Sequence, residues 1–270
     1  MLRTLAIFVS VTLLSITPVY ATYPGSVVSS FFAEPIEEGG VPYYPLGITY
    51  GGGYVWVVYA HALVTKRSPI NGSIVASFYL ESCGWQLGWD GNRKYLYDID
   101  WWCWINWSDP KTGSTIGSFP NPSTGILYGI DYDDGHPGRP IWLGQRGPAW
   151  AWNLTTTGLV VASYDIRSWW YVPDALAYGR TPAGEYIFFG MESAPPYVFV
   201  VNPKNFSMVS SFVAPVGNGG ISDLSWDGEY LWVLENGPPP IKPGWVYRFV
   251  AYSSPAVEPA SVGKIKALYR

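Results

Sequence analysis

The feature that most constrains this chain is a tight turn between two short apolar stretches, repeated along its length. The clearest copies cover residues 49–57, 88–97 and 225–233, the last being Ser-Trp-Asp-Gly-Glu-Tyr-Leu-Trp-Val. Asp-Gly and Gly-Gly pairs adopt the positive φ angles that a hairpin turn requires, so each copy predicts two antiparallel strands. More divergent copies begin at Ile130 and Leu176, which makes five units.

A second hairpin follows the first in four of these units. Its turns are rich in Pro, Asn, Asp, Thr or Gly and cover residues 68–72, 108–113, 153–158 and 202–205. The strand after each turn ends in a serine followed by an aromatic residue. These serines are Ser77, Ser118, Ser163 and Ser211, so successive copies are 41, 45 and 48 residues apart. A period of about 40–50 residues with four strands per unit is typical of β-propeller blades.

The two ends of the chain predict how the ring closes. The fifth unit, residues 220–252, has three strands and no fourth, whereas residues 28–35 match the fourth strand of the preceding unit at residues 209–215. We therefore predict an all-β fold, a five-bladed β-propeller with four antiparallel strands per blade, in which the N-terminal strand joins the last blade. The alternative, a β-sandwich, does not explain an orphan strand at the start that matches a missing strand at the end.

Composition agrees with this architecture. Aromatic residues make up 17% of the chain, and 30 Gly and 24 Pro interrupt it too often for long helices. We name the strands of a blade a to d from the axis outward. Small residues on the predicted strands a, such as Gly47, Gly88, Gly129 and Ala177, suit strands that converge on an axis.

The combined pattern, Trp-Asp-Gly-x-Tyr-Leu-Trp-Val, then Asp-Pro-x-Thr-Gly, then Ser-Phe, resembles a known group of proteins. These are the secreted bacterial β-propeller repeat proteins of the streptogramin-lyase-like and glutaminyl-cyclotransferase-like group. The resemblance spans residues 26–252 and concerns blade geometry. It implies the fold, but no catalytic residue of either enzyme aligns with this chain, so neither activity is expected to carry over.

Residues 1–21 have the pattern of a secretory signal peptide. A charged start precedes an apolar run over residues 5–16, which is shorter than the roughly 20 residues that a bilayer span needs, and small residues lead up to Ala21. We expect cleavage there, a propeller over residues 22–252, and a linker and C-terminal tail over residues 253–270. The mature protein is then secreted, periplasmic or on the cell surface, without a membrane span.

The formal net charge is −4 at pH 7, and four of the basic residues lie in the two end segments rather than in the propeller body. An acidic body repels phosphate backbones and anionic lipids, so nucleic-acid and membrane-surface partners are disfavoured. A carbohydrate or an envelope protein is the expected partner of a monomeric chain. The two histidines, His61 and His136, are too few for a zinc site with three His ligands, and we expect no cofactor.

Two cysteines in an exported chain predict one disulfide. In a four-stranded blade, the b–c and d–a connections lie on one face of the ring, and the a–b and c–d turns lie on the other. Cys83 precedes strand a of the second blade, and Cys103 lies near the b–c turn of the same blade. Both thiols should therefore reach the b–c/d–a face and pair there.

The connections on the b–c/d–a face differ most from blade to blade, and variable loops on a rigid ring are where binding residues usually lie. Two of these loops carry paired tryptophans. We expect a shallow carbohydrate-binding surface in which aromatic rings stack on sugars and polar groups bond their hydroxyls. Its candidate residues are Trp85, Asp100, Trp101, Trp102, Trp169, Trp170 and Tyr171. The alternative is that these rings pack between blades, as most of the 15 Trp must.

Carboxylates indicate a second class of function. Asp131, Asp174 and Asp223 fall on or near strands a, where side chains approach the channel mouth. A glycosidase-like hydrolase or a lyase could use such acids, but the same side chains could bond turn amides or hydrate the channel. Two classes therefore stay open: a non-catalytic binding protein, with no catalytic residue assigned, and an enzyme.

Two further patterns have structural interpretations. Four Asn-x-Ser/Thr sequences, at Asn71, Asn106, Asn153 and Asn205, lie at or beside c–d turns and are interpreted as turn residues, with glycosylation as an alternative mainly for a eukaryotic source. The acidic run at residues 131–135 lacks the rest of a calcium-binding loop, so no metal site is expected.

Overall fold

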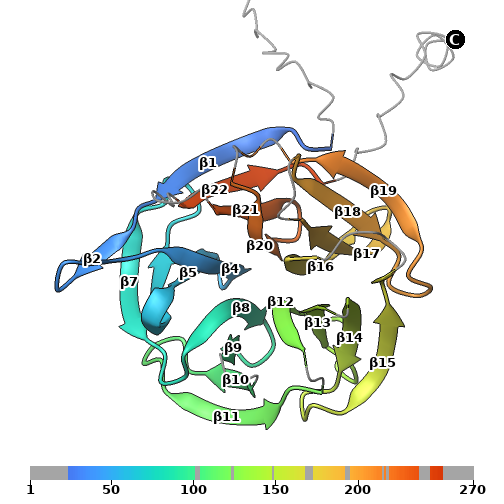
Figure 1. The fold of residues 1–270 in the computed structure, drawn as a ribbon, viewed down its shortest axis with the longest axis horizontal. Helices are drawn as coiled ribbons and strands as arrows, with labels where there is room; N and C mark the ends of the chain where they lie inside the picture. Colours follow the sequence, from blue (N-terminus) through green and yellow to red (C-terminus); the bar gives the residue numbers. More distant parts are fainter. Residues whose placement is uncertain are drawn as a thin grey trace, which may run out of the picture. The chain divides into compact units, whose positions relative to one another are not determined.

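The computed structural model describes residues 24–100, 104–122, 125–147, 149–167, 173–191, 195–214, 216, 219–236 and 244–251. Residues 23–252 form one compact unit, in which five four-stranded antiparallel sheets are arranged as a ring (Figure 1). The five-bladed β-propeller predicted from the repeat is confirmed. The predicted signal segment and C-terminal tail lie outside the described residues.

Each blade runs outward from strand a at the axis to strand d at the rim (Figure 1). Blade 1 consists of β4 (Pro45–Gly51), β5 (Tyr54–Tyr59), β6 (Leu63–Arg67) and β7 (Ile74–Tyr79). Blade 2 consists of β8 (Gly84–Asp90), β9 (Tyr95–Asp100), β10 (Trp104–Ser108) and β11 (Thr115–Pro120). Blade 3 consists of β12 (Ile126–Tyr132), β13 (Ile141–Arg146), β14 (Trp150–Leu154) and β15 (Val160–Asp165). Blade 4 consists of β16 (Ala175–Thr181), β17 (Gly184–Gly190), β18 (Tyr197–Val201) and β19 (Met208–Val213). Blade 5 consists of β20 (Ile221–Trp226), β21 (Leu231–Asn236), β22 (Gly244–Phe249) and β1 (Val27–Ala33).

The ring closes through β1, which supplies the outer strand of blade 5. It pairs antiparallel with β22, from Val27 opposite Phe249 to Ala33 opposite Gly244. Phe31 of β1 is buried and packs against Trp232 of blade 5, with ring centroids 6.3 Å apart. The predicted closure, in which the first strand of the chain completes its last blade, is therefore confirmed.

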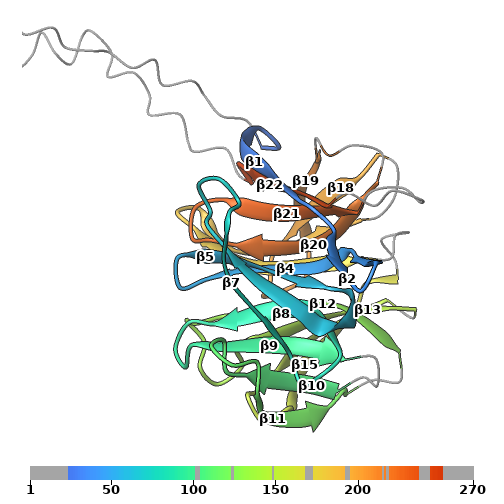
Figure 2. The ribbon, with the colours of Figure 1, turned by 90° about the vertical axis from the view of Figure 1, so that its left-hand side faces the viewer.

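A short hairpin in the connection from β1 to β4 was not predicted. Its strands are β2 (Ile36–Glu38) and β3 (Val41–Tyr43), and its turn uses Gly39 and Gly40, which both have positive φ. A Cβ atom at either glycine would meet nothing within 4 Å, because the hairpin projects outward from the rim of the ring (Figure 1), on the side of the b–c/d–a face (Figure 2). The b–c connection of blade 1 is a single 3-10 turn, η1 (Ala60–Ala62). No helix in the described part of the chain is long and apolar enough to cross a membrane.

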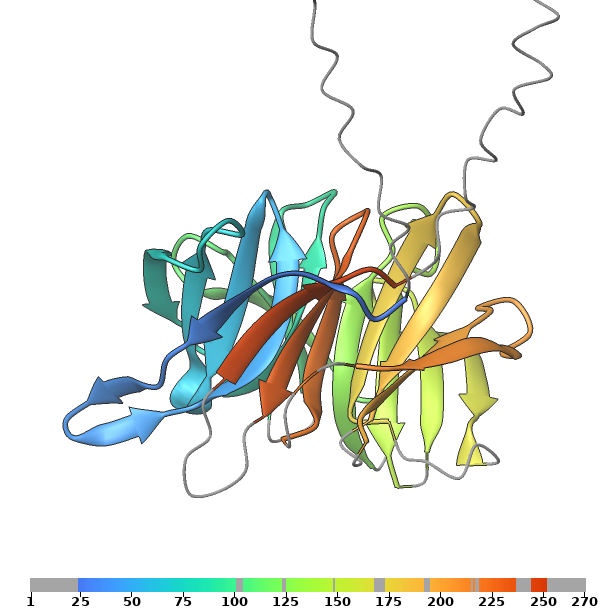
Figure 3. The ribbon, with the colours of Figure 1, turned by 90° about the horizontal axis from the view of Figure 1, so that it is seen from above.

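Aromatic pairs join neighbouring sheets, which stand face to face around the ring (Figure 3). An aromatic residue near the end of each strand a stacks on an aromatic residue of strand b in the preceding blade. The five pairs are Tyr50–Trp232, Trp89–Trp56, Tyr132–Tyr97, Tyr178–Trp142 and Trp226–Phe188, with centroids 5.5–6.2 Å apart and interplanar angles of 7–20°. The two aromatic positions of the sequence repeat are thus the two halves of one interblade stack.

The strands a leave little room at the axis. A Cβ atom at Gly47 would lie 2.7 Å from the carbonyl oxygen of Trp85 in the next blade. At Gly129, which has a φ of +92°, it would lie 2.5 Å from the backbone nitrogen of Leu176. Both distances are shorter than a carbon atom tolerates, which explains the small residues noted on these strands.

Candidate functional site

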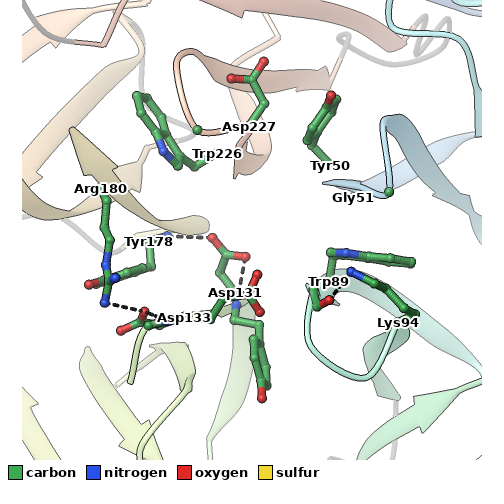
Figure 4. A pocket seen from close by; sticks show the side chains of 16 residues that line it. Tyr50, Gly51, Trp89, Lys94, Asp131, Asp133, Tyr178, Arg180, Trp226 and Asp227 are labelled. Atoms are coloured by element: carbon green, nitrogen blue, oxygen red, sulfur yellow. Dashed lines mark hydrogen bonds and ion pairs between the residues drawn. The ribbon is translucent and has the colours of Figure 1, made fainter. Parts of the chain in front are cut away.

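A cavity of about 540 Å³ lies at the mouth of the axis on the a–b face (Figure 4). All five blades contribute to its wall. The lining residues are Tyr50, Gly51 and Gly52 of blade 1, Trp89, Gly91 and Lys94 of blade 2, Asp131, Tyr132, Asp133, Asp134 and Gly135 of blade 3, Tyr178 and Arg180 of blade 4, and Trp226, Asp227 and Gly228 of blade 5. Its volume falls within the range of roughly 300–1,000 Å³ that is usual for small-molecule sites.

The aromatic part of this wall comes from equivalent positions of the five blades. Each of the five strand-a aromatic residues that form the interblade stacks also lines the cavity. Because each ring rests on a ring of the preceding blade, its position is fixed before any ligand arrives. Such a preformed apolar wall lowers the entropic cost of binding.

Asp131 is a buried carboxyl group of the wall, with 7% of its surface exposed. Its Oδ2 accepts the backbone N–H of Tyr178 at 2.6 Å, and its Oδ1 accepts that of Tyr132 at 2.9 Å (Figure 4). Burial raises the pKa of Asp131 to about 8, although both N–H donors act in the opposite direction. The side chain therefore ties blade 3 to blade 4 and is largely protonated at neutral pH.

The rim of the cavity carries paired charges. The Arg180 guanidinium lies 3.4 Å from Asp133 (Figure 4). It also lies 3.4 Å from Glu185. Asp133 also contacts His136, whose Nδ1 is 2.5 Å from Oδ2. Asp133 is thus paired with the Arg180 cation within the rim and hydrogen-bonded to the His136 ring.

Two other rim residues have different surroundings. Asp227 accepts the indole N–H of Trp232 at 2.9 Å and pairs with Arg248 at 3.1 Å. Asp134 is exposed, and partial burial together with the charge of nearby Asp90 raises its pKa. Asp134 lines the cavity, and hydrogen bonds from the Gly91 and Asn92 backbone together with the charge of Lys94 act on its pKa in the opposite direction.

A smaller cavity of about 100 Å³ occupies the opposite mouth, on the b–c/d–a face. Trp85, Tyr128 and Asp174 line it, with the rings of Trp85 and Tyr128 5.1 Å apart. Arg146 lies 5.3 Å over the Tyr128 ring and 3.3 Å from Asp174 Oδ1. The structure thus brings together Trp85, predicted for the aromatic surface, and Asp174, predicted as a channel carboxylate.

Asp223, the third predicted channel carboxylate, is fully buried between the two mouths. Its two oxygens accept the backbone N–H groups of Ile48 at 2.8 Å and Leu224 at 2.9 Å. The Gln86 amide, in the orientation that satisfies it, donates to both oxygens at 2.8 Å. Burial raises the pKa of Asp223 well above its usual value. This side chain links blade 5 to blades 1 and 2, so the three carboxylates occupy three levels of the axis.

Most of the predicted aromatic surface lies outside the described residues. This holds for Trp101, Trp102, Trp169, Trp170 and Tyr171, so the surface as a whole stays a prediction. Asp100 is described, and its Oδ1 accepts the backbone N–H of Trp104 at 2.8 Å.

The disulfide also stays a prediction. Cys83 is exposed, whereas Cys103 lies outside the part of the chain that is described. Between the described residues, no group of three or more His, Cys, Asp and Glu side chains is arranged to hold a metal ion.

The four Asn-x-Ser/Thr sequences divide into two kinds. Asn71 and Asn205 are exposed turn residues, as interpreted from the sequence. Asn106 and Asn153 are instead buried on strands c. The Asn153 amide donates to the carbonyls of Arg139 at 2.9 Å and Ile141 at 3.2 Å. For these two positions the interpretation as turn residues is wrong, because their side chains bond groups inside the blade.

The a–b face cavity was not expected from the sequence. The a–b turns are short and similar, which favours a scaffolding role. The binding surface was therefore predicted on the variable loops of the other face. The available signal was the acidic run from Asp131 to Asp134, which begins on strand a β12 and continues into the a–b turn. Asp131 takes the position at which other repeats carry Thr49 or Gly88.

Comparison with known proteins supports the fold alone. No protein-family model and no curated protein matches this chain. A glutaminyl cyclase from Myxococcus xanthus has a similar structure, with a TM-score of 0.58 and 11% sequence identity over 83% of this chain and 94% of that chain. The similarity is one of fold. It agrees with the propeller group that the repeat resembles, and at this identity it carries no activity to this chain.

Two further structures are more distant. A chain of the mitotic checkpoint complex has a TM-score of 0.48 and 11% identity, over 88% of this chain and 82% of that chain. The Pan2 WD40 domain of Neurospora crassa has a TM-score of 0.48 and 12% identity, over 71% of this chain and 56% of that chain.

Proposed function

We propose that this protein is an exported, non-catalytic binding protein that holds one unit of a carbohydrate in the cavity on the a–b face. The observation that carries the proposal is the wall of this cavity, where five aromatic residues from five blades surround a group of carboxyl side chains (Figure 4). Export rests on the signal-like segment at residues 1–21.

The chemistry of the wall suits a sugar ring. A sugar has an apolar face of C–H groups, which packs on indole or phenol rings, and an edge of hydroxyl groups, which need hydrogen-bond partners. Trp89 and Trp226 supply apolar surface at fixed positions, while Asp131, Asp134 and Arg180 offer acceptors and donors around it. A volume of about 540 Å³ accommodates one or two sugar rings.

The carbohydrate surface predicted on the b–c/d–a face is a separate proposal. Trp85 and Asp100 belong to it in the described part of the chain, and Trp85 lines the cavity at that mouth together with Tyr128. The cavity at that mouth, about 100 Å³, is too small for a sugar ring to enter. Any carbohydrate on that face would therefore lie across its loops.

A glycan array probed with the full-length protein tests the proposal, followed by titration of the best glycan against two variants. Trp89→Phe keeps an aromatic ring on Trp56 but shortens the wall, and should weaken binding about tenfold. Trp245→Phe is the matched control, because Trp245 lies on outer-sheet strand β22, is 39% exposed and does not line the cavity.

Absence of any bound glycan would overturn the proposal. Equal affinity of the wild-type protein and Trp89→Phe would place the site elsewhere. Trp85→Phe is titrated as a third variant. Loss of glycan binding in Trp85→Phe, with full binding in Trp89→Phe, would favour the b–c/d–a face.

A hydrolase or lyase is the second candidate, and one observation favours it. Asp131 lines the cavity with a raised pKa of about 8, so at neutral pH it carries the proton that a general acid must deliver. Incubating the protein with the polysaccharide that it retains, and following new reducing ends over time, separates the two candidates. Steady release that Asp131→Asn abolishes would support the enzyme, and retention without release would support the binding protein.

A further inference from the structure

We propose that the sugar unit held in the a–b face cavity carries a protonated amine, as in a 2-amino-2-deoxy sugar. This inference rests on the proposed function and deepens it. It follows from how the charged groups of the cavity are distributed.

The wall of the cavity contains more acidic than basic groups. The lining carboxyl groups are those of Asp131, Asp133, Asp134 and Asp227. The lining cations are Lys94 and Arg180. Asp131 is largely protonated in the empty cavity, so the charged excess is three lining carboxylates over two lining cations, and the low-dielectric aromatic walls strengthen its attraction for a cation.

The cations of the wall are already engaged. Arg180 is shared between Asp133 and Glu185, at 3.4 Å from each. The Lys94 ammonium donates to the backbone carbonyl of Gly91 (Figure 4). Neither cation is therefore held ready for an anionic ligand such as a uronic acid or a sulfated sugar.

Asp131 and Asp134 are the two lining carboxyl groups outside the ion pairs described above. Asp131 forms hydrogen bonds to backbone N–H groups, and Asp134 lies close to the backbone of Gly91 and Asn92 and to the charge of Lys94. An ammonium group placed between them would be neutralised, and its charge would lower the pKa of both acids, which burial raises in the empty cavity.

The aromatic walls also suit a cation. Trp89, Trp226 and Tyr178 line the same cavity, and the electron-rich face of such a ring stabilises an ammonium within about 6 Å. A neutral hydroxyl at the same position gains neither this contact nor the ion pair.

Three trisaccharides with the same β-1,4-linked backbone test the inference, because they differ only at carbon 2. They are the trimers of glucosamine, N-acetylglucosamine and glucose, titrated into the full-length protein at pH 6 in low salt and again in 0.5 M NaCl. We expect the glucosamine trimer to bind at least tenfold more tightly than either neutral trimer in low salt, and high salt to reduce this preference.

Asp134→Asn should reduce the preference for the glucosamine trimer at least fivefold and leave binding of the glucose trimer unchanged. Asp109→Asn is the matched control, because it removes the same charge from a c–d turn on the same face, where its Oδ1 accepts the backbone N–H of Lys111. Thermal unfolding of each variant shows that the fold is retained.

Equal or tighter binding of a neutral trimer would overturn the inference while leaving carbohydrate binding in place. Failure of all three trimers to bind would also overturn it, and the glycan array would then judge the proposed function independently. A preference that Asp109→Asn reduces as much as Asp134→Asn would assign it to the overall charge of the protein and not to this cavity.

Discussion

Trp56 and Trp89 show how one pair of residues serves both the fold and the cavity. Their rings stack 5.7 Å apart between blades 1 and 2, and the Trp56 indole donates to the carbonyl of Gly51 at 3.0 Å. Trp89 also lines the a–b face cavity, whereas Trp56 does not. The stability of the interface and the shape of the site therefore depend on the same contact.

Replacing Trp56 by Ala should lower the free energy of unfolding by about 3–5 kcal/mol, because the substitution removes a buried ring and leaves Trp89 without its stacking partner. Trp245→Ala, at a 39% exposed position on β22, should cost about 1 kcal/mol. Urea unfolding of the two variants measures both. Losses of equal size would show that the interblade stacks contribute no more than a surface aromatic residue.

The buried acids predict how stability changes with pH. The pKa of Asp131 is raised from 3.8 to about 8 and that of Asp98 to about 7, in both cases mainly by burial. A raised pKa means that the folded protein holds a proton that the unfolded chain releases. The contribution of each proton to the free energy of unfolding is fully present below about pH 4. It is lost as the pH rises towards the folded-state pKa, by roughly 1 kcal/mol per pH unit for each group.

Asp131→Asn removes one of these titrations, so its free energy of unfolding should fall less steeply than that of the wild type between pH 5 and 7.5. Urea unfolding at several pH values gives the two slopes. Parallel slopes would mean that Asp131 keeps an ordinary pKa in the folded protein.

Glycosylation tests the burial of two asparagines. Secreted from a eukaryotic host, the folded protein should carry glycans at the exposed Asn71 and Asn205 and none at Asn106 and Asn153. Peptide mass spectrometry after glycosidase treatment identifies the occupied positions. A glycan on Asn153 in folded protein would be incompatible with its hydrogen bonds to the Arg139 and Ile141 carbonyls.

Among the secondary-structure elements, β1 is the one that closes the ring. It covers the edge of β22 and buries Phe31 and Ala33, although it is separated from its partner by almost the whole sequence. Without it, blade 5 would expose an unpaired strand edge, which favours aggregation.

Deleting residues 26–35 should therefore make the protein insoluble or lower its melting temperature markedly. The control deletion, residues 38–41, removes only the tip of the β2–β3 hairpin, where a Cβ atom at Gly39 or Gly40 would meet nothing within 4 Å, and should change the melting temperature by a few degrees at most. Differential scanning calorimetry of soluble material compares the two. An unchanged melting temperature after the first deletion would contradict closure by β1.

The elements that the sequence predicted are those with a core face. Alternating apolar residues and Gly-containing turns mark each blade strand, and the match between residues 28–35 and 209–215 was enough to predict the closure. The β2–β3 hairpin was missed because its strands are three residues long and carry exposed side chains such as Val41, so no hydrophobic period marks them.

For the molecule as a whole, the a–b face cavity depends on the closed ring and cannot be inferred from any one blade. The fold followed from local patterns, but the a–b face cavity is assembled from single positions in five blades, about 40–50 residues apart. Each position alone looks like a structural aromatic residue or a turn aspartate. Their convergence appears only once the ring is closed, which is why the sequence pointed to the longer loops of the other face.

The closure by β1 also decides how this propeller responds to a pulling force. Gly25 donates to the Val250 carbonyl at 2.8 Å and Val250 donates to the Ser26 carbonyl at 3.0 Å, so the two ends of the unit leave the ladder side by side. Tension applied between them loads this outermost pair first, and the ladder towards Ala33 and Gly244 then opens one bond after another. Bonds that break in sequence resist far less force than bonds that share the load. Pulled by its ends, the ring should therefore peel open from blade 5 at low force, while its interblade stacks are still intact.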